Sequence, residues 1–134
     1  MASSVFVVGS EVAPVSHVVT MDDMVLFEPE DEKNIHTDDA VARAAGLPAA
    51  IAAGVQFMSY VLEMLQQSYG ASSVTGTVLD LRIRAPVFAG DTVTARGQVS
   101  GVADGRAVLD VWCENQRGEQ VIAGTAEVPA GAAP

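Results

Sequence analysis

Apolar residues dominate one continuous stretch near the middle of the chain, "AAIAAGVQFMSYVLEMLQQSYG". Its length and its content of alanine, leucine and methionine predict a long helix that ends at Gly70. Apolar side chains recur on nearly every side of this helix, so we expect neighbouring elements to cover almost all of it. The polar positions form only a narrow stripe, which consists of Gln56, Ser59, Glu63 and Gln67.

The second half of the chain alternates between apolar and polar positions, which is the period of a half-buried strand. The predicted strands are "VLDLRIR", "TVTARGQVSGV", "AVLDVWCEN" and "QVIAGTAEV". Asp104-Gly105 and Arg117-Gly118 separate the last three and predict short turns between antiparallel neighbours. The pattern therefore predicts an α+β fold in which a curved antiparallel sheet wraps around one long helix.

Shorter elements are expected before the long helix. "VSHVVT" has the alternation of a strand, and Thr20 with an acid three residues later has the spacing of a capping box. This spacing predicts a helix over residues 21–28, before a proline. Thr37 is the expected N-cap of a second short helix, "DDAVARAA", which Gly46 should end.

The length of 134 residues fits one domain over residues 1–134, and the end "PAGAAP", residues 129–134, is expected to be a flexible tail. The lone cysteine, Cys113, cannot form an internal disulfide or a cysteine metal cluster, and it is interpreted as strand filling.

The net charge of −10, from 17 acidic and 7 basic residues, repels nucleic acid and anionic membrane surfaces as partners. The start lacks the features of a secretory signal, and no apolar run is long enough to span a membrane, so a cytoplasmic location is expected.

The acidic stretch "EDEKNIHTDD" contains one of the chain's 2 histidines and carries the first candidate chemistry. Asp31 and His36 are five residues apart, so they can meet only if the residues between them turn, and Asn34 suits such a turn. A carboxylate beside an imidazole can exchange protons near neutral pH. The alternative interpretation is a surface loop whose histidine lies among solvated acids.

Four segments in this order, "DEKNIHTD", "AGLPAAIAAG", "APVFAGDTV" and "NQRGEQVIAGTAEV", resemble the MaoC-like hot-dog family, which includes (R)-specific enoyl-CoA hydratases and 3-hydroxyacyl dehydratases. The resemblance covers residues 20–128. The family's first segment reads Asp, any residue, Asn, Pro, any residue, His, often with an acid two residues later. Asp31 and His36 match its Asp and His, and Asp38 matches the later acid.

The resemblance implies a hot-dog fold and reversible addition of water to a 2-enoyl thioester, carried by coenzyme A or a carrier protein. It implies Asp31 and His36 as the catalytic pair and (R)-stereochemistry, with no metal or redox cofactor. Three positions depart from the family pattern. Lys33 replaces the usual Asn, Asn34 replaces the Pro, and Ala53 replaces a common His.

Gly54 is the candidate oxyanion site, because free backbone N–H groups at a helix start carry partial positive charge. Its alternative role is to permit tight packing of the helix against the sheet. Ser59, on the polar stripe, could orient active-site groups, although a helix serine more commonly bonds its own backbone. His17 is interpreted as structural.

Arg82 and Arg84 share one strand face and could bind a phosphorylated part of the substrate, or they could be solvated residues near acids. A small sheet leaves an edge and an apolar face to cover, so a homodimer with sites near the interface is expected. Other functions stay open. The alternatives are a hot-dog acyl-CoA thioesterase, a non-catalytic acyl-binding or partner subunit, and a dehydratase or isomerase for an unusual acyl chain.

Overall fold

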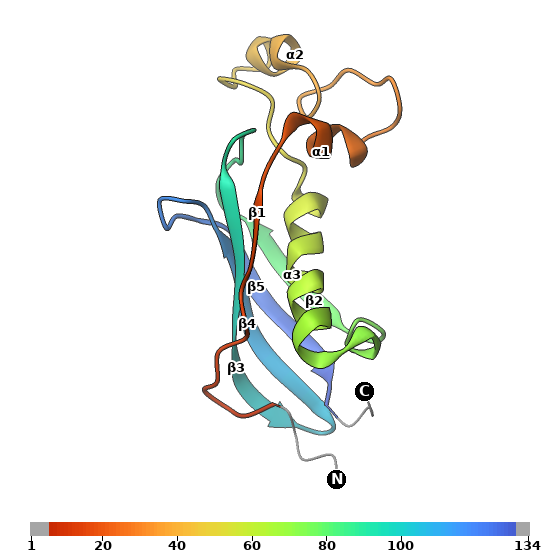
Figure 1. Cartoon of the computed structure of the whole chain (residues 1–134), viewed down its shortest axis with the longest axis vertical. Helices are drawn as coiled ribbons and strands as arrows, with labels where there is room; N and C mark the ends of the chain where they lie inside the picture. The colour runs from red at the N-terminus through yellow and green to blue at the C-terminus, as the bar shows by residue number, and fades with distance from the viewer. Residues whose placement is uncertain (1–5, 131–134) are drawn as a thin grey trace.

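The computed structural model describes residues 6–130, in which a long helix packs on one face of a five-stranded sheet (Figure 1). The two short helices lie together beyond the sheet, near the start of the long one (Figure 1). The elements in chain order are β1 Val15–Val18, α1 Met21–Leu26, α2 Asp39–Ala44, α3 Gly54–Tyr69, the 3-10 turn η1 Ala71–Ser73, β2 Val78–Ile83, β3 Thr92–Ala103, β4 Arg106–Glu114 and β5 Gln120–Pro129.

The sheet has the order β1-β3-β4-β5-β2, and every neighbouring pair is antiparallel. The predicted meander of β3, β4 and β5 is therefore confirmed. β2 pairs with β5 instead of the following strand β3, so β5 and β4 lie between these two strands in the sheet. The α+β class, with one long helix against a curved antiparallel sheet, is confirmed (Figure 1).

The core lies between α3 and the inner face of the sheet. Phe57, Val61, Met64 and Leu65 of α3 are buried there, together with inner residues of β3, β4 and β5. The expectation that α3 is covered on nearly all sides is wrong for this chain by itself, because a sheet covers only one face of a helix. Val55 is 48% exposed, and residues 66–68 are exposed too.

The two short helices begin at side-chain caps. Thr20 Oγ1 accepts a hydrogen bond from Asp23 N, as predicted, although α1 ends at Leu26, before the expected end at residue 28. α2 is capped by Asp38, whose Oδ1 accepts from Val41 N, so the prediction of Thr37 as its cap is wrong. Thr37 is unable to serve because its hydroxyl bonds within the preceding loop.

The long helix starts at Gly54, and the alanine-rich residues before it are extended. Ile51 N donates to Ile35 O at 3.0 Å, and Ala52 N donates to Val87 O at 2.8 Å. This segment, residues 50–53, is therefore held between the loop before α2 and the segment before β3.

The ordered sheet extends into the predicted tail. Pro129 belongs to β5, and Ala130 N donates to Gly105 O at 2.8 Å, so residues 129 and 130 are fixed by the β3–β4 turn. The rest of the predicted tail, residues 131–134, lies outside the described residues. No helix between residues 6 and 130 is long and apolar enough to cross a membrane.

The sheet depends on one glycine where β5 meets β2. A Cβ atom on Gly124 would lie 1.9 Å from Asp80 O and 2.9 Å from Asp80 C, both of which belong to the backbone of β2. Backbone atoms of a paired strand cannot move aside as a flexible side chain can. Any larger residue would therefore separate β2 from the sheet.

We predict that Gly124→Ala lowers the free energy of unfolding by more than about 2 kcal/mol, because the added methyl forces the two backbones apart. Urea denaturation measures the change. The matched control is Gly101→Ala, because a Cβ at Gly101 meets nothing within 4 Å. Equal stability of the two variants would contradict this account of the β2–β5 contact.

Candidate active site

The loop between α1 and α2 is bent around the side chain of Asn34. Its Oδ1 accepts from His36 N at 2.8 Å, and its Nδ2 donates to Glu28 Oε1 at 2.8 Å and to Glu32 Oε1 at 3.3 Å. Thr37 Oγ1 accepts from Asn34 N at 3.0 Å and donates to Glu32 O at 2.8 Å. An asparagine that bonds the backbone two residues later makes a turn, as the sequence predicted for Asn34.

His36 is held against the segment that leads into α3. Its Nδ1 lies 2.8 Å from Ile51 O. A carbonyl oxygen can only accept, so Nδ1 carries the proton, and the neutral ring then presents the lone pair of Nε2. The ring is therefore held beside Ile51, which lies three residues before the start of α3.

Asp31 belongs to the same bent loop but forms no hydrogen bond or ion pair with His36 within residues 6–130. Its side chain is exposed, and its φ of 62° lies in the left-handed region, which aspartate tolerates better than most residues. Glu32 N donates to Pro29 O at 3.2 Å and closes a turn around it. No hydrogen bond within residues 6–130 joins Asp31 to His36, so the catalytic pair stays a prediction.

The start of α3 has unused backbone donors. Ala53 is the N-cap and supplies no side-chain hydrogen bond, and no acid lies in the first turn. The N–H groups of Gly54 and Val55 donate to no acceptor in the described part of the chain. Such groups carry the positive end of the helix dipole and favour a developing negative charge.

Gly54 also serves packing. A Cβ at this position would lie 2.5 Å from Ile83 Cδ1, so the missing side chain lets α3 approach the end of β2. Both interpretations of Gly54 made from the sequence therefore have a structural basis.

The other candidates lie apart from the His36 loop. Ser59 Oγ donates to Gln56 O of its own helix, which is the structural alternative. In β2, Leu79 and Leu81 are partly buried, whereas Arg82 is exposed. Arg84, just beyond β2, is exposed too. Neither arginine forms an ion pair with another described residue, so both guanidinium groups are available to an anion.

Sequence reasoning placed Gln56 on a polar stripe of α3 but missed its burial and its bond to Tyr60. Gln56 is fully buried, and its Nε2 donates to Tyr60 OH at 2.9 Å. The ring of His17 stacks on Tyr60 with centroids 4.5 Å apart, and His17 Nε2 lies 2.6 Å from Glu63 Oε1. His17 thus joins β1 to α3. The signal for the Gln56–Tyr60 pair was their four-residue spacing, which places them on one helix face.

Burial explains the shifted acidities nearby. It raises the pKa of the Tyr60 hydroxyl above its usual value, and it raises the pKa of the Cys113 thiol to about 12. Cys113 lies under α3, with its Sγ 3.6 Å from Phe57 O. Both groups are therefore neutral near pH 7.

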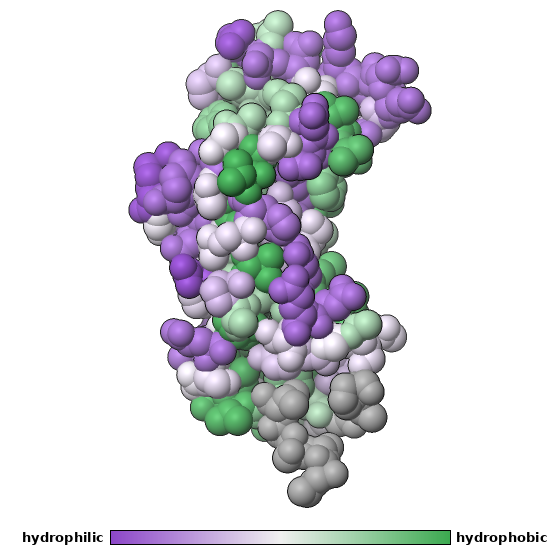
Figure 2. Space-filling view, in the orientation of Figure 1, coloured by the Kyte–Doolittle hydropathy of each residue, from purple (hydrophilic) through white to green (hydrophobic). Residues whose placement is uncertain are grey.

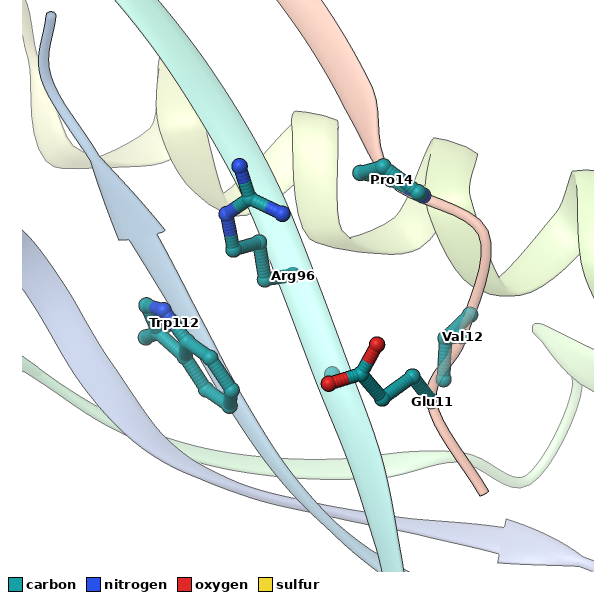
Figure 3. Close-up of a pocket in the computed structure, with 6 residues that line it drawn as sticks. Glu11, Val12, Pro14, Arg96 and Trp112 are labelled. Atoms are coloured by element: carbon teal, nitrogen blue, oxygen red, sulfur yellow. The ribbon is translucent and has the colours of Figure 1, made fainter. Parts of the chain in front are cut away.

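A small hollow beside β3 and β4 is separate from the His36 loop (Figure 3). Its volume is about 50 Å³, well below the roughly 300 Å³ of the smallest usual ligand pockets. Within residues 6–130, no group of three or more His, Cys, Asp or Glu side chains could hold a metal ion. The hollow is lined by Glu11, Val12, Pro14, Arg96, Gly97 and Trp112.

The family model "MaoC like domain" matches residues 6–121 of the chain. The chain belongs to the MaoC-like family. A search of curated proteins finds no match.

Solved structures with the same fold include two hydratases. R-hydratase PhaJ1 from Pseudomonas aeruginosa is 26% identical with a TM-score of 0.78, and the match covers 93% of this MaoC-like chain and 82% of that one. The (R)-hydratase of A. caviae involved in PHA biosynthesis is 27% identical with a TM-score of 0.77, and the match covers 92% of this chain and 96% of that one.

The ChsH1-ChsH2 complex from Mycobacterium tuberculosis has a chain with a TM-score of 0.78 at 24% identity, and the match covers 92% of this chain and 98% of that one. At this identity the likeness shows the fold alone.

We predict that Asn34→Ala loosens the loop that positions His36, because the His36 amide loses its acceptor. Hydrogen exchange at that amide should become at least about tenfold faster, while exchange in β3 and β4 is unchanged. Lys33→Ala is the matched control, because Lys33 is an exposed neighbour whose side chain bonds no other group within residues 6–130. The same exchange rate in both variants would show that Asn34 does not hold the loop.

Proposed function

We propose that this MaoC-like protein reversibly adds water to a 2-enoyl thioester and forms a 3-hydroxyacyl thioester. The observation that carries the proposal is the bond from His36 Nδ1 to Ile51 O, which holds the imidazole beside the segment that leads into an uncapped helix start. Family membership and the likeness to two R-hydratases support the same reaction and suggest (R)-stereochemistry.

The backbone N–H groups at the start of α3 would bind the thioester oxygen. Charge moves onto that oxygen as water attacks C3, and each donor at such a site contributes about 10²–10³-fold to the rate. Gly54 N and Val55 N have no other acceptor within residues 6–130. They would therefore stabilise the enolate with no internal bond to break.

The proton transfers fall to His36 and Asp31. One of the pair takes a proton from water while its oxygen bonds to C3, and the pair returns a proton to C2 as the enolate collapses. No electrons are lost or gained, so the chemistry needs no redox cofactor. The mechanism requires the exposed Asp31 carboxylate to turn toward His36 when substrate binds, which accords with the looser geometry of unliganded active sites.

The thioester carrier and the assembly are part of the proposal. Arg82 and Arg84 would bind phosphate groups of coenzyme A or of a carrier-protein arm. The free edge of β2, with Val78 54% and Ile83 64% exposed, supports pairing with a second copy in a cytoplasmic homodimer. Ile83 contacts the Gly54 position, so the second copy would lie beside the site.

A non-catalytic acyl-binding subunit is the second candidate. Asp31 forms no hydrogen bond with His36 within residues 6–130, and Lys33, Asn34 and Ala53 depart from the family pattern. A protein of this kind would bind enoyl thioesters without converting them. A thioesterase would instead release free thiol, and product analysis with enoyl-CoA separates the three.

We predict that Asp31→Asn and His36→Ala each lower turnover of the best enoyl-CoA by at least about 10²-fold, because each removes a proton-transfer group. Loss of the enoyl absorbance measures turnover, and circular dichroism checks the fold. Asp104→Asn is the matched control, since Asp104 also has positive φ but lies in the β3–β4 turn. Near-normal turnover in either active-site variant would rule out the catalytic pair.

We predict that the double variant Arg82→Ala and Arg84→Ala raises KM for an enoyl-CoA by about tenfold, the effect of losing one to two charge-assisted contacts. KM for the matching N-acetylcysteamine thioester, which lacks phosphate, should stay unchanged. Arg117→Ala removes an exposed arginine from the β4–β5 turn and serves as control. An equal rise for both thioesters would place the arginines outside the phosphate site.

A further inference from the structure

Gln56 is the one described residue with a buried side-chain atom that lacks a hydrogen-bond partner. The residue is fully buried, its Nε2 donates to Tyr60 OH at 2.9 Å, and its Oε1 accepts from no group in residues 6–130. An unsatisfied buried carbonyl oxygen lowers the stability of the folded protein, because it has lost its hydrogen bonds to water. A leucine or methionine would fill the same space in α3 without that cost.

The other buried polar side chains of the described chain build local structure. Ser73 Oγ donates to Gly70 O at 2.7 Å after α3, Asp91 Oδ2 accepts from Phe88 N at 2.9 Å, and Asn115 Oδ1 accepts from Arg117 N at 3.0 Å. Each of these closes a turn. Gln56 lies inside a helix, so its side-chain amide does not close a turn as these three side chains do.

The position of Gln56 connects it with the proposed thioester site. It lies in the first turn of α3, two residues after Gly54, which is an axial rise of about 3 Å. The bond to Tyr60 holds the carboxamide in one orientation, and Tyr60 is itself packed against His17. The acceptor oxygen therefore belongs to the same turn of α3 as the backbone donors that would bind the thioester.

We propose that Gln56 determines substrate specificity by accepting a hydrogen bond from a hydroxyl group on the acyl chain, beyond the reacting carbons. This inference rests on the proposed function, and it narrows the substrate class to thioesters with a hydroxylated acyl chain. A plain hydrocarbon chain would leave the Gln56 oxygen unpaired in the complex. A site built to bond a hydroxyl disfavours such an analogue, because its own polar group then stays unsatisfied.

The experiment measures binding by titration calorimetry with saturated acyl-CoA probes, so that no reaction is needed. The probes have four to eight carbons, each with and without a terminal hydroxyl. At one chain length, the wild-type protein should bind the hydroxylated probe at least about tenfold more tightly than its plain counterpart. Gln56→Leu keeps the volume, removes the acceptor and should abolish this preference.

The matched control is Gln66→Leu, which makes the same chemical change at an exposed position of α3. It should keep the wild-type preference. A wild-type protein without hydroxyl preference at any chain length would overturn the inference, and so would an undiminished preference in Gln56→Leu. Thermal unfolding of the variants confirms that each is folded.

Hydration of 2-hexenoyl-CoA by the same wild-type preparation tests the proposed function separately. Hydration without hydroxyl preference would overturn only the role of Gln56. Preference without hydration would overturn the catalytic proposal and leave Gln56 as the specificity residue of an acyl-binding protein.

Discussion

The extended segment of residues 50–53 is the constraint on which the rest of the site depends. Its backbone bonds Ile35 O on one side and Val87 O on the other, while Ile51 O accepts from His36 Nδ1. Ala50 N also donates to Asp39 Oδ1 at 2.9 Å, which ties the start of α2 to the same segment. Because α3 begins directly after it, the segment fixes the histidine and the helix start in one frame.

Because of this arrangement, the loop that carries His36 is held by hydrogen bonds and by the core, and not by electrostatic interactions among its own acidic side chains. The loop of His36 is acidic and adds to the hydrophilic surface around the short helices (Figure 2), and its residues 29–33 are exposed, so screening by solvent weakens their electrostatic interactions. Backbone hydrogen bonds and the Asn34 side chain supply its shape instead. The core under α3, where Phe57 and Leu65 are buried, supplies the rigid support.

The sequence predicted the sheet and its turns because alternation over long strands and the turn at Asp104-Gly105 are local signals. It also placed Gly70 and Gly46 at helix ends, where positive φ favours glycine. Residue patterns could not separate Thr37 from Asp38 as a cap, because both have suitable side chains. That choice depends on the loop, in which the Thr37 hydroxyl has other partners.

The other differences between the sequence-based predictions and the structure depend on tertiary contacts. Gln56 was assigned to the polar stripe of the helix, but the direction of that stripe depends on how α3 lies on the sheet, and the structure buries it. The spacing of Asp31 and His36 does not encode the directions of their side chains, and no hydrogen bond within residues 6–130 joins the two. The bend at Asn34, in contrast, was predictable because it arises from bonds between near neighbours in the chain.

The start of α3 has no side-chain cap, so a substitution that stabilises the helix could also remove the backbone donors that would bind a ligand. Serine or aspartate at the cap position of Ala53 would typically strengthen a helix by about 1 kcal/mol. The same side chain would occupy the amides that are otherwise open to an incoming oxygen. A search for thermostable variants would therefore tend to select residues at Ala53 that block the binding end of the helix.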